Sequence, residues 1–93
     1  MNGIMEELEA IIANRRANRV EGSYTCKLFA AGRSRIAQKV GEEAVETVVA
    51  ALAQDDGRVT AEVADLVYHL LVLLADCGLA WADVEAELAQ RRW

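Results

Sequence analysis

Residues 59–77 read VTAEVADLVYHLLVLLADC, and this stretch decides the fold. Apolar side chains occur on nearly every side of it, which is the pattern of a buried helix. Among the apolar residues lie the polar side chains of Glu62, Asp65 and His69, with Asp76 further along the same stripe. At about 100° per residue, the first three share an arc of about 60° on one side of the helix. Because an unpaired carboxylate in a protein core costs several kcal/mol, we expect these acids to have partners.

The remainder of the chain divides into further helical segments at glycines and turn residues, and it contains no proline. Apolar spacings of three and four predict helices over residues 4–17, 24–31, 34–53, 59–77 and 81–91. We expect Ser34 to cap the third helix, residues 55–57 to form a turn and Gly78 to follow the fourth helix. Aromatic residues make up only 5% of the chain, which disfavours an all-β fold. The sequence therefore predicts an all-α fold of four to five helices in a single domain, residues 1–93.

The composition excludes several classes of protein. A hydrophobic fraction of 54% excludes intrinsic disorder, and a net charge of −5 argues against a nucleic-acid-binding protein. No apolar run approaches the roughly 18 residues of a membrane span, and the glutamates near the N-terminus do not fit a signal peptide. Cys26 and Cys77 form no zinc-binding pattern with the single histidine. Two reduced thiols are typical of a cytoplasmic protein, and we expect that location.

A second group of acids precedes the apolar helix in the sequence. Residues 39–46 read KVGEEAVE. On a helix, Glu42, Glu43 and Glu46 lie within an arc of about 100°, and Lys39 lies inside the same arc. A glutamate-rich face is commonly just the solvated face of an amphipathic helix, so this group alone indicates no site.

Together, the two acidic helices predict a metal site. Glu43 and Glu46 are three residues apart, as are Glu62 and Asp65, so each pair lies on one face of its helix. The short turn between the helices makes them antiparallel neighbours. A set of four carboxylates suits Mg²⁺ or Mn²⁺. A di-iron site would need Glu-x-x-His on two helices, and the chain has one histidine. The other alternative, a helical interaction module with a solvated acidic face, leaves the acids on the apolar helix unexplained.

Most of the bases precede these acids. Seven of the ten lysines and arginines lie between positions 15 and 39: Arg15, Arg16, Arg19, Lys27, Arg33, Arg35 and Lys39. A metal site beside a basic segment suits a polyphosphate, since cleavage of a phosphoanhydride depends on charge neutralisation and positioning. We expect Arg15 and Arg16 only to occupy a helix end, as Arg91 does, whereas Lys39 lies beside the carboxylates.

Three stretches of this sequence resemble one enzyme family. They are residues 23–25 (SYT), residues 36–46 (IAQKVGEEAVE) and residues 62–69 (EVADLVYH), and they are similar to the phosphoribosyl-ATP pyrophosphatases, within the MazG-like all-α nucleotide pyrophosphatases. The resemblance implies Mg²⁺-dependent hydrolysis of phosphoribosyl-ATP to phosphoribosyl-AMP and pyrophosphate, the second step of L-histidine biosynthesis. The nearest alternative is a house-cleaning nucleoside triphosphate pyrophosphatase of the MazG or dCTPase type, which would use the same four carboxylates.

The same resemblance implies roles for individual residues. The metal ligands that it implies are Glu43, Glu46, Glu62 and Asp65. The substrate-binding residues that it implies are Tyr24, Thr25, Lys27, Lys39 and His69. Glu42 completes the catalytic set, either by activating water or by supporting the ligands. For His69, a role as an ordinary hydrogen-bonded core histidine has comparable weight.

The uncovered apolar surface favours association of two chains, and a glycine inside a helix indicates a close contact. The two long helices are apolar over more surface than three short neighbours can cover, and the family is dimeric, so we expect a MazG-like bundle completed by a homodimer. Gly41 lies inside a predicted helix, where glycine costs about 1 kcal/mol relative to alanine. This glycine therefore suggests close approach by a neighbouring helix or by the substrate.

Overall fold

The computed structural model describes residues 3–93, and over this range the chain consists of five helices without a strand. The helices are α1 (Ile4–Ala17), α2 (Tyr24–Ala31), α3 (Arg33–Ala53), α4 (Asp56–Asp76) and α5 (Trp81–Arg91). The prediction of an all-α fold is confirmed.

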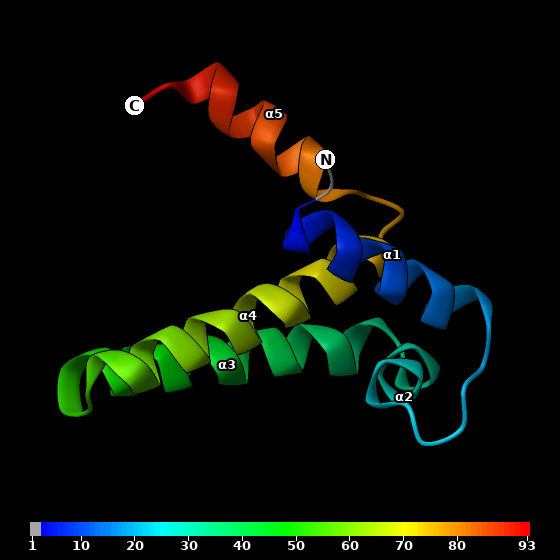
Figure 1. Ribbon diagram of the computed structural model, residues 1–93, viewed down its shortest axis with the longest axis horizontal. Coiled ribbons are helices and arrows are strands. Elements are labelled where there is room, and N and C mark those ends of the chain that lie inside the picture. Colours follow the sequence, from blue (N-terminus) through cyan, green and yellow to red (C-terminus); the bar gives the residue numbers. More distant parts are fainter. Residues whose placement is uncertain (1–2) are drawn as a thin grey trace.

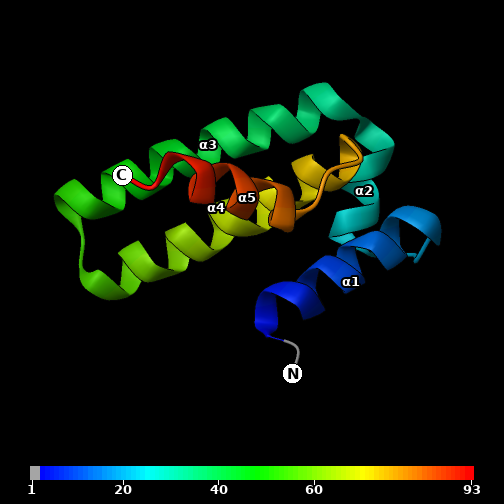
Figure 2. The ribbon, with the colours of Figure 1, turned by 90° about the horizontal axis from the view of Figure 1, so that it is seen from above.

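The two longest helices, α3 and α4, form an antiparallel hairpin that gives the molecule its long axis (Figure 1). α1 packs against α4 and α2, near the C-terminal half of α4 (Figures 1 and 2). α5 extends away from the hairpin and contains no buried residue. Within residues 3–93, no single helix is long and apolar enough to cross a membrane; α4 and α5 reach that length only as a pair, bent by 104°.

The buried core joins the first four helices. α1 contributes Ile12, α2 contributes Leu28, α3 contributes Ile36, and α4 contributes Leu71 and Val72. Each of these side chains is at most 3% exposed. Because this core lies at one end of the hairpin, it holds α2 beside α4 and leaves the turn of the hairpin outside.

Two details of the helix ends differ from the sequence predictions. Ser34 does not cap α3: the helix begins at Arg33, directly after Gly32, whose φ of 95° is readily adopted by glycine. Residues 55–57 do not form a separate turn either. Asp55 is the N-cap of α4, its carboxylate accepts a hydrogen bond from the Arg58 N–H at 2.9 Å, and the two residues after it are already helical. Gly78, with a φ of 74°, follows α4 as predicted.

α3 turns the side that carries Glu43, and not the side that carries Val45 and Leu52, toward α4. Its buried residues are Ile36, Glu43 and Ala50, which are spaced seven apart. The apolar residues of the opposite side remain exposed, with Val45 at 63% and Leu52 at 84%. We call this opposite side the outer stripe of α3; it comprises Gly41, Val45, Val48, Val49 and Leu52. The alternative of a merely solvated acidic face therefore fails for Glu43.

The expectation that α4 is buried on all faces is met only in part within one chain. Val63 is 41% exposed, although the neighbouring Glu62 is buried. At Gly41, a methyl group would meet no atom of a neighbouring helix within 4 Å, so no helix within the described residues explains this glycine. Both observations leave apolar surface that a single chain does not cover.

Candidate metal centre and active site

Three carboxylates meet where α3 and α4 face each other. Glu43 comes from α3, and Glu62 and Asp65 come from α4. One oxygen of each lies within 4.8 Å of the other two, and we call these three residues the carboxylate trio. The predicted antiparallel pairing of the helices is what brings them together, since Glu62 and Asp65 are one turn apart on the face that meets Glu43.

Two buried oxygens of the carboxylate trio, Glu43 Oε2 and Glu62 Oε2, have no hydrogen-bond partner in the part of the chain that the structure describes. The second oxygen of each residue has a cation nearby: Arg58 pairs with Glu62, and Lys39 Nζ lies 3.6 Å from Glu43 Oε1. A buried, unsatisfied oxygen on a charged group costs more than about 1–3 kcal/mol. Hard oxygen donors aimed at one point are what Mg²⁺ and Mn²⁺ bind, so the trio could hold a divalent metal ion.

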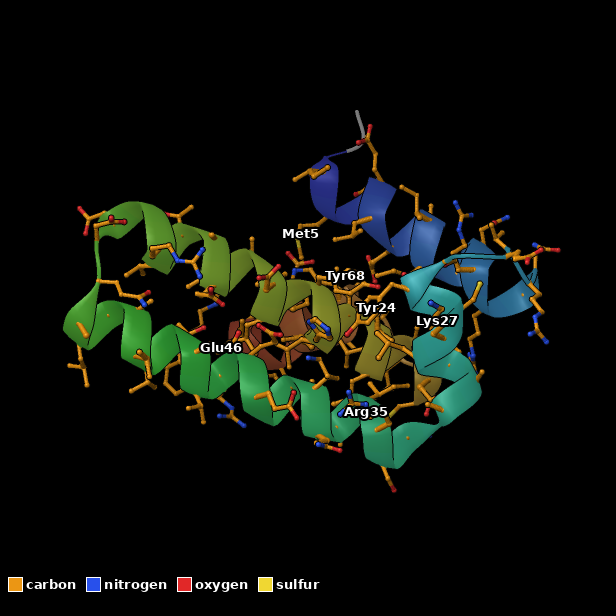
Figure 3. All side chains as sticks on the ribbon, turned by 90° about the horizontal axis from the view of Figure 1, so that it is seen from below. Met5, Tyr24, Lys27, Arg35, Glu46 and Tyr68 are labelled. Atoms are coloured by element: carbon orange, nitrogen blue, oxygen red, sulfur yellow. The ribbon has the colours of Figure 1, made fainter. Side chains whose placement is uncertain are left out.

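Glu46 lies outside the trio. It is on α3, one turn after Glu43, and its side chain is exposed (Figure 3). The structure therefore brings together three of the four carboxylates expected as metal ligands. The role of Glu46 as a fourth ligand stays a prediction.

A second cluster surrounds Glu42 on the exposed side of α3. One carboxylate oxygen of Glu42 accepts from Lys39 Nζ at 3.2 Å, and the other accepts from Gln38 Nε2 at 2.9 Å. Arg35 lies 3.7 Å from the same carboxylate. Hydrogen bonds from Lys39 and Gln38 lower the pKa of Glu42, and the bond to Glu42 raises the pKa of Lys39. Glu42 therefore stays ionised and is a weak base, while Lys39 stays cationic beside the trio.

Two hydrogen bonds join consecutive residues of α2 to consecutive residues of α4. The Tyr24 hydroxyl lies 3.0 Å from His69 Nε2, and the Thr25 hydroxyl pairs with the Tyr68 hydroxyl. His69 Nδ1 lies 2.7 Å from the backbone carbonyl of Asp65. Since a carbonyl only accepts, His69 carries its proton on Nδ1, and Nε2 accepts from Tyr24. We call the Tyr24–His69 and Thr25–Tyr68 bonds the α2–α4 clamp.

The clamp includes three of the predicted substrate-binding residues. The side-chain polar groups of Tyr24, Thr25 and His69 bond to groups of the same chain, and His69 is only 5% exposed. His69 thus has the bonds of a satisfied core histidine, and through the Asp65 carbonyl it touches the turn that carries a trio carboxylate. Contacts of these three residues with substrate stay predictions.

Lys27 lies one turn after Tyr24 on α2 and takes no part in the α2–α4 clamp. Figure 3 shows Tyr24 beside Tyr68, whereas Lys27 lies apart from that pair. Lys27 lines a cavity of about 900 Å³ together with Arg15, Arg16 and Arg19. The two arginines expected only to occupy the end of α1 do lie in its last turn, and they also form part of this cavity wall.

Two ion pairs of the site region did not follow from the sequence analysis. Arg58 pairs with Glu62 one turn later, a spacing of four that the helix periodicity could have revealed. Arg33 Nε donates to Asp76 at 2.6 Å, and no sequence signal connects residues so far apart. These arginines give two acids of α4 the partners that the sequence seemed not to supply.

Comparison with known proteins identifies one family. The family described as phosphoribosyl-ATP pyrophosphohydrolase matches residues 5–92. The phosphoribosyl-ATP pyrophosphatase of Paramagnetospirillum magneticum is 59% identical over 88 residues, which cover 95% of this chain and 81% of the relative. That of Metallosphaera sedula is 52% identical over 91 residues, 98% of each chain. A histidine biosynthesis bifunctional protein of Pasteurella multocida is 52% identical over 87 residues, 94% of this chain and 43% of the relative.

Proposed function

Because the chain belongs to the phosphoribosyl-ATP pyrophosphohydrolase family, we propose that the carboxylate trio is the centre at which it hydrolyses phosphoribosyl-ATP to phosphoribosyl-AMP and pyrophosphate. This chain has phosphoribosyl-ATP pyrophosphatase activity in histidine biosynthesis. The observation that carries the location of the site is the pair of buried, unpartnered oxygens on Glu43 and Glu62. We also propose that residues 1–93 act as one domain in the cytoplasm.

The metal ion that the trio would hold is Mg²⁺, and Mn²⁺ would serve in its place. Its ligands would be Glu43, Glu62 and Asp65, with Glu46 as a fourth carboxylate from the next turn of α3. When bound, the cation neutralises charge on the phosphate oxygens and so favours departure of pyrophosphate. The unpartnered oxygens support this assignment, because their free lone pairs need a positive partner.

Lys39 and Glu42 act as a pair beside the trio. The Lys39 ammonium group, kept charged by its raised pKa, is placed to meet phosphate oxygens of the substrate. Glu42 holds this ammonium in place by its hydrogen bond of 3.2 Å. Its lowered pKa makes proton abstraction from water unfavourable, which favours the supporting role over the water-activating role.

The α2–α4 clamp positions the segment that the family resemblance places over the substrate. Tyr24 and Thr25 fix the first turn of α2 against α4, one turn after Asp65. The two hydroxyl groups orient α2 through these hydrogen bonds. The ring of Tyr24 is 47% exposed and can therefore form a wall of the site. His69 supports Asp65 by donating to its carbonyl.

We propose that two chains associate through the outer stripe of α3. Four aliphatic side chains lie along it, with Leu52 84% exposed and Val48 56% exposed. A contiguous apolar stripe of this kind on a small protein marks an interface. Gly41 lies on the same stripe with open space above it, which lets a partner helix approach closely.

The proposed site is tested by measuring pyrophosphate release from phosphoribosyl-ATP in the presence of Mg²⁺. Asp65→Asn and Glu46→Gln should each lower kcat by about 100-fold or more, because each removes a charge that stabilises the reacting phosphates. Glu85→Gln, on the exposed surface of α5, is the matched control and should keep full activity. If both site variants kept full activity, the proposed site would be wrong. Turnover of dCTP and dUTP, measured in parallel, distinguishes the house-cleaning alternative.

A further inference from the structure

A cavity of about 900 Å³ lies between the end of α1, the loop over residues 18–23 and the first turns of α2. Four cationic side chains line it: Arg15, Arg16, Arg19 and Lys27. We call it the basic cavity. Among the described residues, 3–93, none of these four side chains forms an ion pair, and Arg15 donates only to the neutral amide of Asn14.

The other bases of the chain differ from these four in their ion pairs. Most of them have an acidic partner, in the pairs Arg33–Asp76, Arg35–Glu42, Lys39–Glu42, Arg58–Glu62 and Arg91–Glu87. The wall of the basic cavity has one acid, Glu21, which pairs with none of the four cations within residues 3–93. In a chain of net charge −5, four cations that form no ion pair within residues 3–93 surround one hollow and create a local field that favours an anion.

The N-terminus of α2 adds to this field. Ser23, the N-cap of α2, and Cys26 both line the cavity, so the positive end of the α2 helix dipole lies at its wall. The pKa of the Cys26 thiol is lowered, first by a hydrogen bond with Ser23, then by one from the Val20 N–H, and further by the charges of Arg15 and Arg19. Negative charge is thus stabilised at this wall.

The basic cavity and the carboxylate trio lie on different sides of α2. The α2 residues in the cavity wall include Ser23, Cys26 and Lys27, which share one helix face. The Tyr24 and Thr25 hydroxyls instead bond to α4, where the α2–α4 clamp joins them to the turn after Asp65. The cavity cations are therefore placed for a phosphate group other than the ones beside Lys39 and the trio.

We propose that the basic cavity is a second phosphate site that binds a phosphomonoester dianion. Such a group is available from two sources, the phosphoribosyl end of the substrate or a free phosphate compound. The first source rests on the proposed function, whereas the binding itself does not. Arginine and lysine with a helix N-terminus are the usual protein ligands of phosphate, and the cavity offers all of them.

The binding experiment uses inorganic phosphate and ribose 5-phosphate as probes, with ¹H–¹⁵N NMR of the full chain at low salt. Phosphate should shift the amides of residues 19–27, and the double variant Arg19→Gln/Lys27→Gln should weaken binding about tenfold or more, because hydrogen bonds to charged groups are involved. The control Arg91→Gln/Arg92→Gln removes the same charge at the end of α5 and should bind as the wild type does. Absence of shifts at residues 19–27, or equal weakening in both double variants, would overturn the proposal.

The kinetic experiment distinguishes the two sources. If the substrate carries the phosphate, the Arg19→Gln/Lys27→Gln variant should raise KM for phosphoribosyl-ATP about tenfold at nearly unchanged kcat, because binding away from the cleaved bond is lost. If phosphate binds but KM stays the same, the site serves a free phosphate compound, and added phosphate should compete with ribose 5-phosphate alone. A wild-type chain that bound phosphate but released no pyrophosphate would contradict the proposed function and leave the cavity site standing.

Discussion

Replacing Glu43 by glutamine should stabilise the metal-free protein and abolish its stabilisation by metal. Two unit charges 4.8 Å apart repel by about 3 kcal/mol at an effective dielectric constant of about 20. Glutamine removes this repulsion with Glu62 and, to a smaller extent because of water screening, with the exposed Asp65. It also loses the attraction to Lys39 Nζ at 3.6 Å, about 4.6 kcal/mol at the same dielectric constant, which offsets the repulsion relieved at both acids. The remaining effect is the removal of the buried, unpartnered charge on Glu43 Oε2. We therefore expect the free energy of unfolding to rise by about 1–2 kcal/mol.

In the presence of a divalent cation, the wild-type protein should instead be more stable than the Glu43→Gln variant. A ligand at 100 times its Kd stabilises the wild-type fold by about 2.7 kcal/mol, and the variant lacks the ligand that makes this possible. Thermal unfolding followed by circular dichroism, at one protein concentration, in EDTA and in excess MgCl₂, measures both effects. One kcal/mol corresponds to about 4–8 °C in Tm for a chain of this length. A Glu43→Gln variant that was less stable in EDTA, or that kept the wild-type Mg²⁺ shift, would refute the reasoning; Glu85→Gln serves as the control.

Three further predictions concern the surroundings of the trio. Glu42→Gln should destabilise the protein at neutral pH, because the folded state lowers the pKa of Glu42 from 4.5; the difference should vanish as the pH falls through that lowered pKa, and a pH series of urea unfolding curves checks it. Leu52→Asp should shift sedimentation from a dimer toward the 10.2 kDa monomer, and an unchanged dimer would exclude the outer stripe of α3 as the interface. Tyr24→Phe removes the hydroxyl at 3.0 Å from His69 and should raise the Mg²⁺ concentration for half-maximal activity several-fold; a pure loss of stability with unchanged Mg²⁺ dependence would contradict its positioning role.

The sequence predicted the helices and the meeting of the acids for one physical reason, the helical period. The same period that places Glu62 and Asp65 on one face, together with the short turn at residues 54–55, brings them to Glu43 in the structure. The helix ends were less predictable. Gly32 adopts a φ of 95°, so α2 can end and α3 begin at one residue, which makes a cap at Ser34 unnecessary.

Which side of α3 faces α4 could not be predicted from the apolar pattern. That pattern places Val45, Val48 and Leu52 on one side, and such a side normally faces the core of the same chain. In the structure it faces outward, and Glu43 takes the buried position. A helix that buries Glu43 and exposes Val45, Val48 and Leu52 is what the proposed metal ion and the proposed second subunit would explain.

Contacts between residues far apart in sequence were also beyond the sequence analysis. Nothing in the sequence indicates that Arg33 binds Asp76, or that Tyr24 meets His69, because these contacts follow from the packing of α2 and α3 against α4. The basic cavity is another feature that depends on how the helices pack. The excess of bases before residue 39 was visible, but its division into paired bases and unpaired cavity cations follows only from the fold.

The central claim is that the carboxylate trio holds the metal ion used in hydrolysis. Its most direct test is anomalous diffraction from crystals of the wild-type chain grown with Mn²⁺. We expect a manganese peak bound to oxygens of Glu43, Glu62 and Asp65, at about 2.0–2.3 Å from each, and no such peak in crystals of the Glu43→Gln variant. A manganese ion bound elsewhere, with the trio empty while the enzyme releases pyrophosphate, would contradict it.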